Sequence, residues 1–333
     1  MYRRSHFFCA RNLRGRRYIP EAPAGVFLSS APANRRPLWA PLEKMSADNT
    51  SPLQDWVGKS ELHSDVVALT PIAALSATLD RDDPLPQPGD SLPPLWHWLY
   101  FLTVRRASEL GRDGHPARGG FLPPVALPRR MWAGGRLQFH HPLRAGEEIS
   151  RESRIVKVTE KMGRTGTLVF VLVRHEIRNA AGVAITEEHD IVYRDDPKPD
   201  DPKPAPCAAP TEAAWTREIV PDETLLFRYS ALTFNGHRIH YDYRYVTEVE
   251  GYDGLVVHGP LIATLLLDLV RRHRPEEQVV RFEVRALRPV TVTGVPLMFC
   301  GQPEADGKTV KLWTRDHEGW LTMEGTATMA EKL

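Results

Sequence analysis

The feature that most limits how this chain can fold is an internal repetition of the same order of segments. An apolar segment that we expect to be helical, residues 95–111, precedes strand-like alternation over 136–193. A second such segment, 260–273, precedes similar alternation over 281–329. Sequence identity between the halves is weak, but an identical order of elements is the stronger sign of duplication.

Turn residues recur at matching places within the two strand-rich runs. In each run a proline, then a glycine, and later a hairpin glycine interrupt the alternation, at Pro142, Gly146 and Gly182 and at Pro289, Gly294 and Gly319. A long helix followed by an antiparallel meander, present twice, predicts an α+β fold.

Composition shifts divide the chain into four parts. Residues 1–44 are rich in arginine and poor in acids, which is typical of a transit peptide but also of a disordered extension or a mis-assigned start before Met45. Residues 196–213 form a proline-rich linker, because proline stops helices and central strands. We therefore expect an N-terminal domain at 45–195 and a C-terminal domain at 214–333.

Charge and cysteine content exclude several functional classes. The 333 residues carry a net charge of +1, which gives no electrostatic reason to expect a nucleic-acid or membrane partner. The 3 cysteines form no CxxC pair, so we expect a reducing compartment and no cysteine-based zinc site. No apolar run approaches the roughly 20 residues that span a bilayer.

The stretch "RYSALTFNGHRIHYD" (228–242) concentrates proton-handling side chains in one short loop. His237 and His240 have the HxxH spacing of a chelate, yet no third ligand stands at a characteristic distance. A solvated loop without chemistry is a second interpretation. General acid–base catalysis is a third, since an imidazole exchanges protons near neutral pH and the neighbouring amide of Asn235 can hold water.

A helix start lies shortly after this loop. Gly259 precedes an apolar run, and Pro260 occupies the first helical position, where an N–H is not needed. The free N–H groups and the positive helix end can stabilise the oxygen of a thioester that gains negative charge. Together with the polar loop, this predicts an acid–base site facing an oxyanion site.

These segments resemble the MaoC-type (R)-specific enoyl-thioester hydratases and dehydratases. The resemblance is carried by "PPLWHWLYF" (93–101), "PRRMWAGG" (128–135), "FRYSALTFNGHRIHYD" (227–242) and "GLVVHGPLIATLL" (254–266). It is strongest toward a subgroup with mesaconyl-C4-CoA and itaconyl-CoA hydratases and type 2 hydroxyacyl-thioester dehydratases. The resemblance implies a double hot dog fold, in which antiparallel sheets wrap around long central helices.

Site residues follow from the resemblance position by position. His240 falls on the family's catalytic histidine, and Asn235 falls where the wider family has an aspartate, so Asn235 can orient water but cannot act as a base. His258 and Gly259 fall at the substrate thioester, with the Gly259 N–H on its carbonyl. The first half lacks such a loop and is expected to shape the acyl pocket. Its Arg129 and Arg130 are candidates for binding a substrate carboxylate.

The resemblance thus implies a hydro-lyase that hydrates mesaconyl-C4-CoA or itaconyl-CoA. A fatty-acid (R)-3-hydroxyacyl-thioester dehydratase and a non-catalytic acyl-CoA-binding protein remain alternatives, the latter because of Asn235. We expect an acyl-CoA thioester as the substrate partner, neither cofactor nor metal, and either a monomer or a homodimer of double hot dog units. The expected location is cytoplasmic, or mitochondrial if residues 1–44 are a transit peptide.

Overall fold

A single antiparallel sheet forms the frame of the protein. The computed structural model describes residues 53–163, 166–196 and 205–331. The predicted extension at 1–44 lies outside them, as do residues 197–204 of the predicted linker. In the described part, the sheet has 10 strands: β1 (Ser60–Val66), β2 (Arg129–Phe139), β3 (Glu148–Gly163), β4 (Gly166–Asn179), β5 (Gly182–Arg194), β6 (Trp215–Ile219), β7 (Val279–Ala286), β8 (Leu297–Pro303), β9 (Thr309–Arg315) and β10 (Leu321–Met329).

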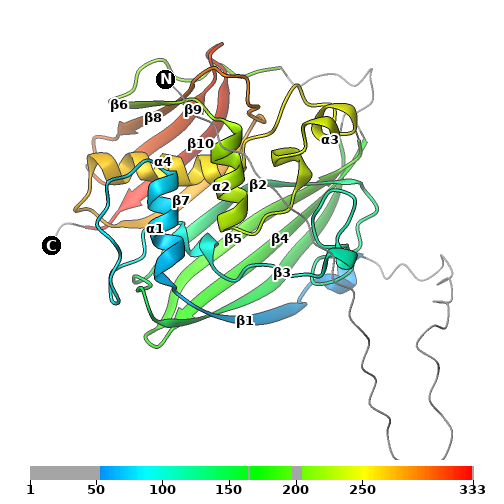
Figure 1. Ribbon diagram of the computed structural model, residues 1–333, viewed down its shortest axis with the longest axis horizontal. Coiled ribbons are helices and arrows are strands. Elements are labelled where there is room, and N and C mark those ends of the chain that lie inside the picture. The colour runs from blue at the N-terminus through cyan, green and yellow to red at the C-terminus, as the bar shows by residue number, and fades with distance from the viewer. Residues whose placement is uncertain (1–52, 164–165, 197–204, 332–333) are drawn as a thin grey trace, which may run out of the picture. The chain divides into compact units, whose positions relative to one another are not determined.

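The strand order shows that the two halves have the same topology. Across the sheet it runs β1-β3-β4-β5-β2 and then β7-β10-β9-β8-β6 (Figure 1). Read inward from its own edge, the second half repeats the first strand for strand. The halves meet where β2 pairs antiparallel with β7, from Gly134 opposite Arg285 to Gln138 opposite Arg281. The predicted duplication and the double hot dog fold are therefore confirmed.

The second half contains the long helix expected of a hot dog fold. Helix α4 (Gly259–His273) packs against β6, β8, β9 and β10, and every residue from Leu261 to Val270 is buried. Proline in its first turn fits a helix start, as predicted. Its one buried acid, Asp268, is held by arginines of both halves, namely Arg81, Arg217 and Arg272.

The first half has no helix of comparable length in its described residues. Its α-helix is α1 (Leu69–Thr78), and the helix predicted at 95–111 is wrong. That segment contains only the 3₁₀ turns Trp96–Leu99 and Ala107–Glu109. Leu95 and Phe101 have positive φ angles of 70° and 57°. Residues 95–97 and 99–101 are all buried, whereas a helix of this length would bury one face.

Shorter helices surround the predicted polar loop. Helix α2 (Glu223–Leu232) starts at Asp222, whose side chain accepts a hydrogen bond from the Leu225 N–H, and it packs beside α1. A 3₁₀ turn, Arg238–His240, and helix α3 (Tyr243–Glu248) follow α2 in the chain. Another 3₁₀ turn, Leu53–Trp56, lies at the start of the described residues. None of the described helices combines the length and apolar character needed to cross a membrane.

Candidate active site

The polar loop is shaped by the end of helix α2. Phe234 has a positive φ angle of 50°, and the Asn235 N–H then donates to the carbonyl oxygen of Ser230 at 2.8 Å. The Asn235 side-chain oxygen accepts the His237 N–H at 3.0 Å. The Asn235 amide nitrogen has no hydrogen bond within the described residues, so it can donate to a water molecule.

His240 is held as a neutral base. Its side chain is buried, and Nδ1 lies 2.6 Å from the carbonyl oxygen of Val256, which can only accept a hydrogen bond. Nδ1 therefore carries the proton, and Nε2 keeps its lone pair. Burial lowers the pKa of His240 to about 4, although the Val256 carbonyl acts in the opposite direction. The imidazole is thus free to accept a proton at neutral pH.

His258 supports His240 from the start of helix α4. The two rings are stacked, with centroids 3.5 Å apart and an interplanar angle of 17°. His258 Nε2 lies 2.8 Å from Oγ of Ser230, and burial keeps the pKa of this imidazole well below its usual value. Its Nδ1 atom has no hydrogen-bond partner within the described chain. The predicted residues Asn235, His240 and His258 therefore lie in one cluster.

Gly259 lies next to a residue of the first half. As the first residue of α4, it belongs to the turn whose N–H groups have no acceptor within the helix. A Cβ atom at this position would lie 2.7 Å from Cε3 of Trp132 in β2. The indole thus packs directly on the backbone that is predicted to hold the thioester oxygen, and only glycine leaves room for it.

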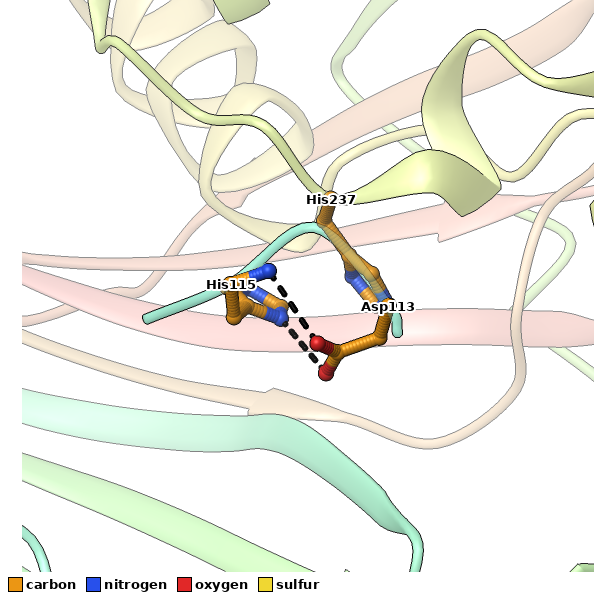
Figure 2. Close-up of side chains that lie close together, drawn as sticks. All are labelled: Asp113, His115 and His237. Carbon is orange, nitrogen blue, oxygen red and sulfur yellow. Dashed lines mark hydrogen bonds and ion pairs between the residues drawn. The ribbon is translucent and has the colours of Figure 1, made fainter. Parts of the chain in front are cut away.

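The first half also contributes an aspartate–histidine pair that the sequence analysis missed. The Asp113 carboxylate accepts the His115 N–H at 3.1 Å and lies 3.0 Å from Nδ1 of the same residue. The His115 ring lies beside the His237 ring (Figure 2), with centroids 4.1 Å apart. The centroids of the His237 and His240 rings are 5.3 Å apart. "DGH" at 113–115 is a local signal for this pair, but nothing in it indicates that it meets the second half.

Backbone contacts fix this meeting of the two halves. The Arg238 N–H donates to the Asp113 carbonyl oxygen at 2.9 Å. Gly114 has a φ angle of +85°, and a Cβ atom there would lie 2.0 Å from the Gly236 carbonyl oxygen. The loop around Asp113 therefore packs directly on the polar loop, with no space for a side chain at Gly114.

Electrostatics favours neutral imidazoles in this cluster. Burial lowers the pKa of His115, and burial together with the His115 ring lowers that of His237 to about 2. The bond to His115 keeps the pKa of Asp113 below its usual value although burial opposes this. These three residues bring ligand atoms within 4.8 Å of one another, but both Asp113 oxygens already bond His115. The nearby charge of Arg130 also acts against a bound cation.

The two predicted arginines have different surroundings. Arg129 is 6% exposed, and its Nε lies 2.9 Å from a Glu250 carboxylate oxygen and 3.2 Å from one of Asp196. Its guanidinium also donates to the Glu250 carbonyl. Nε and one terminal nitrogen of Arg129 are therefore engaged within the chain, and its binding of a substrate carboxylate stays a prediction. Arg130 instead lies near enough to His115 and His237 to lower the pKa of both.

Comparison with known proteins gives a consistent picture. Residues 95–292 match the profile of a family described as hydroxyacyl-thioester dehydratase type 2. The chain is 47% identical over 254 residues to mesaconyl-C(4)-CoA hydratase of Chloroflexus aurantiacus, covering 75% of this chain and 89% of that one. It is 30% identical to the mitochondrial type 2 hydroxyacyl-thioester dehydratase of Schizosaccharomyces pombe, over 71% of this chain and 88% of the relative.

Solved structures agree in fold at low sequence identity. A MaoC-like dehydratase superposes with a TM-score of 0.65 at 15% identity, over 84% of this chain and 100% of that one. A double hot dog protein of Mycobacterium tuberculosis gives a TM-score of 0.51 at 16% identity, over 84% of this chain and 98% of the other. These similarities support the fold, independently of any substrate.

Proposed function

We propose that this chain, which belongs to the hydroxyacyl-thioester dehydratase type 2 family, adds water reversibly to mesaconyl-C4-CoA or to itaconyl-CoA. The enzyme is a hydro-lyase, and an acyl-CoA thioester is its substrate. The substrate proposal rests on the 47% identity to a mesaconyl-C4-CoA hydratase over most of both chains. The proposed acid–base mechanism rests on one observation: the neutral His240 imidazole donates a hydrogen bond from Nδ1 to the Val256 carbonyl oxygen.

The mechanism that we propose uses His240 as base and then as acid. Nε2 of His240 takes a proton from water while the water oxygen bonds to the β-carbon of the enoyl group. The double-bond electrons move toward the thioester oxygen, and the N–H of Gly259 stabilises the resulting enolate. The imidazolium then returns its proton to the α-carbon, which restores the neutral histidine.

Asn235 orients the water in this scheme. Its side-chain oxygen is occupied by the His237 N–H, so the amide nitrogen is left to donate to the water oxygen. Because an amide cannot accept the proton, the base function stays with His240. His258, stacked under His240, holds that ring at the N-terminus of α4.

Arg130 is our candidate for binding the substrate carboxylate. In mesaconyl-C4-CoA the carboxylate is bonded to the same carbon that receives the hydroxyl group, so it must lie near the water-activating histidine. The charge of Arg130 acts on His115 and on His237, whose ring is 5.3 Å from that of His240. A guanidinium in this place can form charge-assisted hydrogen bonds with a carboxylate.

Hydration of a panel of enoyl-CoAs tests the proposal. Mesaconyl-C4-, crotonyl- and a medium-chain enoyl-CoA would be followed by loss of the conjugated thioester absorbance, and these three together with itaconyl-CoA by product mass. We expect turnover of the dicarboxylic substrates to exceed that of the others. Preference for the plain chains would contradict the substrate class, and binding without turnover would indicate a non-catalytic protein.

The alternative is (R)-3-hydroxyacyl-thioester dehydration in fatty-acid synthesis. It is favoured by the similarity to the fission yeast enzyme and by a relative from Saccharomyces cerevisiae that is 25% identical over 219 residues. The same panel separates the two functions, because a fatty-acid enzyme would act on crotonyl and medium-chain substrates.

We further propose a cytoplasmic location and a homodimer of double hot dog units. The low cysteine content supports a reducing compartment, while the arginine-rich residues 1–44 support a mitochondrial alternative. Cell fractionation would distinguish the compartments, and light scattering would give the mass of the assembly.

A further inference from the structure

The inner face of the first half holds an irregular segment where the second half holds a long helix. Helix α4 fills the inner side of β6 and β8–β10, while the corresponding strands of the first half are covered by the irregular segment 95–122 (Figure 1). A pocket of about 290 Å³ lies against these strands, lined by Trp98, Phe101, Arg151, His175 and Glu187 among others. The first half thus has space for a ligand group in place of a long helix.

This pocket adjoins the active site. Thr233, which is two residues from Asn235, lines it. Trp132, which packs on Gly259, has its ring 6.2 Å from that of Trp98 and 6.1 Å from that of His189, and both of these residues line the pocket. One indole ring therefore separates the pocket from the start of helix α4, which suits a space that receives the acyl end of a thioester.

Polar side chains face this pocket, which is unusual for a purely hydrocarbon ligand. Ser153, His175 and Glu187 stand opposite one another on β3, β4 and β5 and so share a face of the sheet. Arg151, two residues before Ser153, lies on the same face. The buried polar atoms of this wall need hydrogen-bond partners, because unpaired buried polar groups are costly.

Arg151 is the charged member of the wall that lacks a partner. Among the described residues it forms no ion pair, and its Nε atom is buried without a hydrogen bond, while its guanidinium lies 5.0 Å from the Phe101 ring centre. Burial lowers the pKa of Arg151, which reflects the cost of holding this cation away from water. Nδ1 of His97, another lining residue, is also unpaired.

Nearby carboxylates do not bind Arg151 because each has other partners. Glu187 lies 3.1 Å from Nε2 of His97 and accepts the Trp98 indole N–H at 3.1 Å. Asp65 accepts the backbone N–H groups of Val66 and Phe101. Glu61 lies 3.3 Å from Nε2 of His63. Their charges attract Arg151 at longer range, yet its donors remain available to an incoming anion.

We propose that Arg151 is the counter-ion for a carboxylate carried by the acyl group, and that the pocket beside it is the subsite for that end of the substrate. This inference rests on the proposed function, in which the substrate is a dicarboxylic acyl-CoA. A partly buried guanidinium such as that of Arg151 binds a carboxylate through charge-assisted hydrogen bonds and discriminates against a methyl group in the same place. Mesaconyl-C4-CoA has one free carboxylate, on the β-carbon and within reach of Arg130, so Arg151 would bind a carboxylate placed further along a longer dicarboxylic acyl chain.

Substrates that exchange a carboxylate for a methyl group provide the test. The pairs are mesaconyl-C4-CoA with 3-methylcrotonyl-CoA, and 2-hexenedioyl-CoA with 2-hexenoyl-CoA. Values of kcat/KM would be measured for the wild type, Arg151→Met and Arg151→Lys. The control is Arg154→Met, a residue on the same strand that is exposed and paired with Glu152.

We expect Arg151→Met to lower kcat/KM for the carboxylated member of at least one pair about 10- to 100-fold, as loss of a hydrogen bond to a charged group does. The neutral member should change little, Arg151→Lys should restore part of the loss, and the control should match the wild type. Thermal unfolding of each variant would show that the fold is kept, and Arg151→Lys tests the same selectivity if Arg151→Met does not fold.

The outcomes separate this inference from the proposed function. A wild type that prefers carboxylated substrates, with the preference unchanged in Arg151→Met, would overturn the role of Arg151 and leave the proposed function standing. A wild type that hydrates only the neutral members would overturn both. Equal losses for both members of a pair would show that Arg151 acts on folding or general binding, contrary to the inference.

Discussion

Replacing Gly259 by alanine tests whether the N-terminus of helix α4 stabilises the reacting thioester. The new Cβ atom would lie 2.7 Å from Cε3 and 3.1 Å from Cζ3 of Trp132. Since carbon atoms pack at about 3.5 Å or more, the helix start or the indole must move by about 0.8 Å. Overpacking of this kind destabilises a protein by about 1–3 kcal/mol. A catalytic group displaced by about 1 Å loses about 10²-fold in rate.

A double-mutant cycle with Trp132→Leu tests whether the loss of activity in Gly259→Ala comes from the steric clash with the indole ring. We expect Gly259→Ala to lower kcat about 10²-fold, and Trp132→Leu to restore much of this activity because it removes the clashing ring atoms. Gly120→Ala is the control, since a Cβ atom there meets no other atom within 4 Å. Full kcat in a folded Gly259→Ala protein would refute the assignment of this backbone to the oxyanion site.

Three further predictions concern the base, the pH dependence and the buried acid. His240→Ala should fold normally and lose hydration by about 10²-fold or more, and retained activity in a folded variant would contradict its role as the base. Burial holds the pKa of His240 at about 4 and that of His175 at about 3, below the 6.5 of a free imidazole. Between about pH 4 and 6.5 the unfolded chain therefore binds more protons than the folded one. The free energy of unfolding should then fall as the pH drops from about 7 to 4, by up to about 1.4 kcal/mol per pH unit for each imidazole. An unfolding temperature independent of pH in this interval would argue against neutral buried imidazoles. Asp268→Asn should destabilise the fold by about 3–5 kcal/mol, because it leaves three arginines without their shared carboxylate, and chemical denaturation that shows no loss would contradict this account.

The polar loop at 228–242 and the helix that starts at Gly259 were predictable because their signals are local. Gly259 and Pro260 mark a helix start, and an apolar run follows without interruption. Asn235 and His240 stand close together in the sequence, after a break that the structure places at the end of helix α2. Their prediction as site residues also used family resemblance, and the structure brings them together with His258.

The helix predicted at 95–111 shows where local pattern misleads. Its apolar residues are dense enough for a helix, but in the structure Trp96, Leu99 and Phe101 are all buried in consecutive irregular turns. Phe101 donates its N–H to the Asp65 side chain at 2.7 Å, a distant bond that replaces a helical one. Apolar content predicts burial, whereas helical conformation also requires that burial fall on one face.

Neighbouring residues on a strand show a second limit. Arg129 and Arg130 are adjacent on β2, and successive side chains of a strand point to opposite faces of the sheet. One therefore pairs with Glu250, and the other lies near His115. From the sequence, both arginines were equal candidates for binding a substrate carboxylate, because the sequence does not show which face of the sheet each side chain occupies.

By itself, the sequence determined the repeated order of strands, the polar loop at 228–242 and the helix that starts at Gly259, because each depends on residues close together in the chain. Only the tertiary structure decided which residues of the first half reach that site. The pairing of β2 with β7 joins the halves in one sheet. In the same structure Trp132 packs on Gly259, and Asp113 contacts the polar loop. Whether Arg151 has a counter-ion likewise depends on the hydrogen bonds and ion pairs that Glu187, Asp65 and Glu61 form with other residues. These residues are distant from Arg151 in the sequence, so their partners cannot be read from the order of the chain.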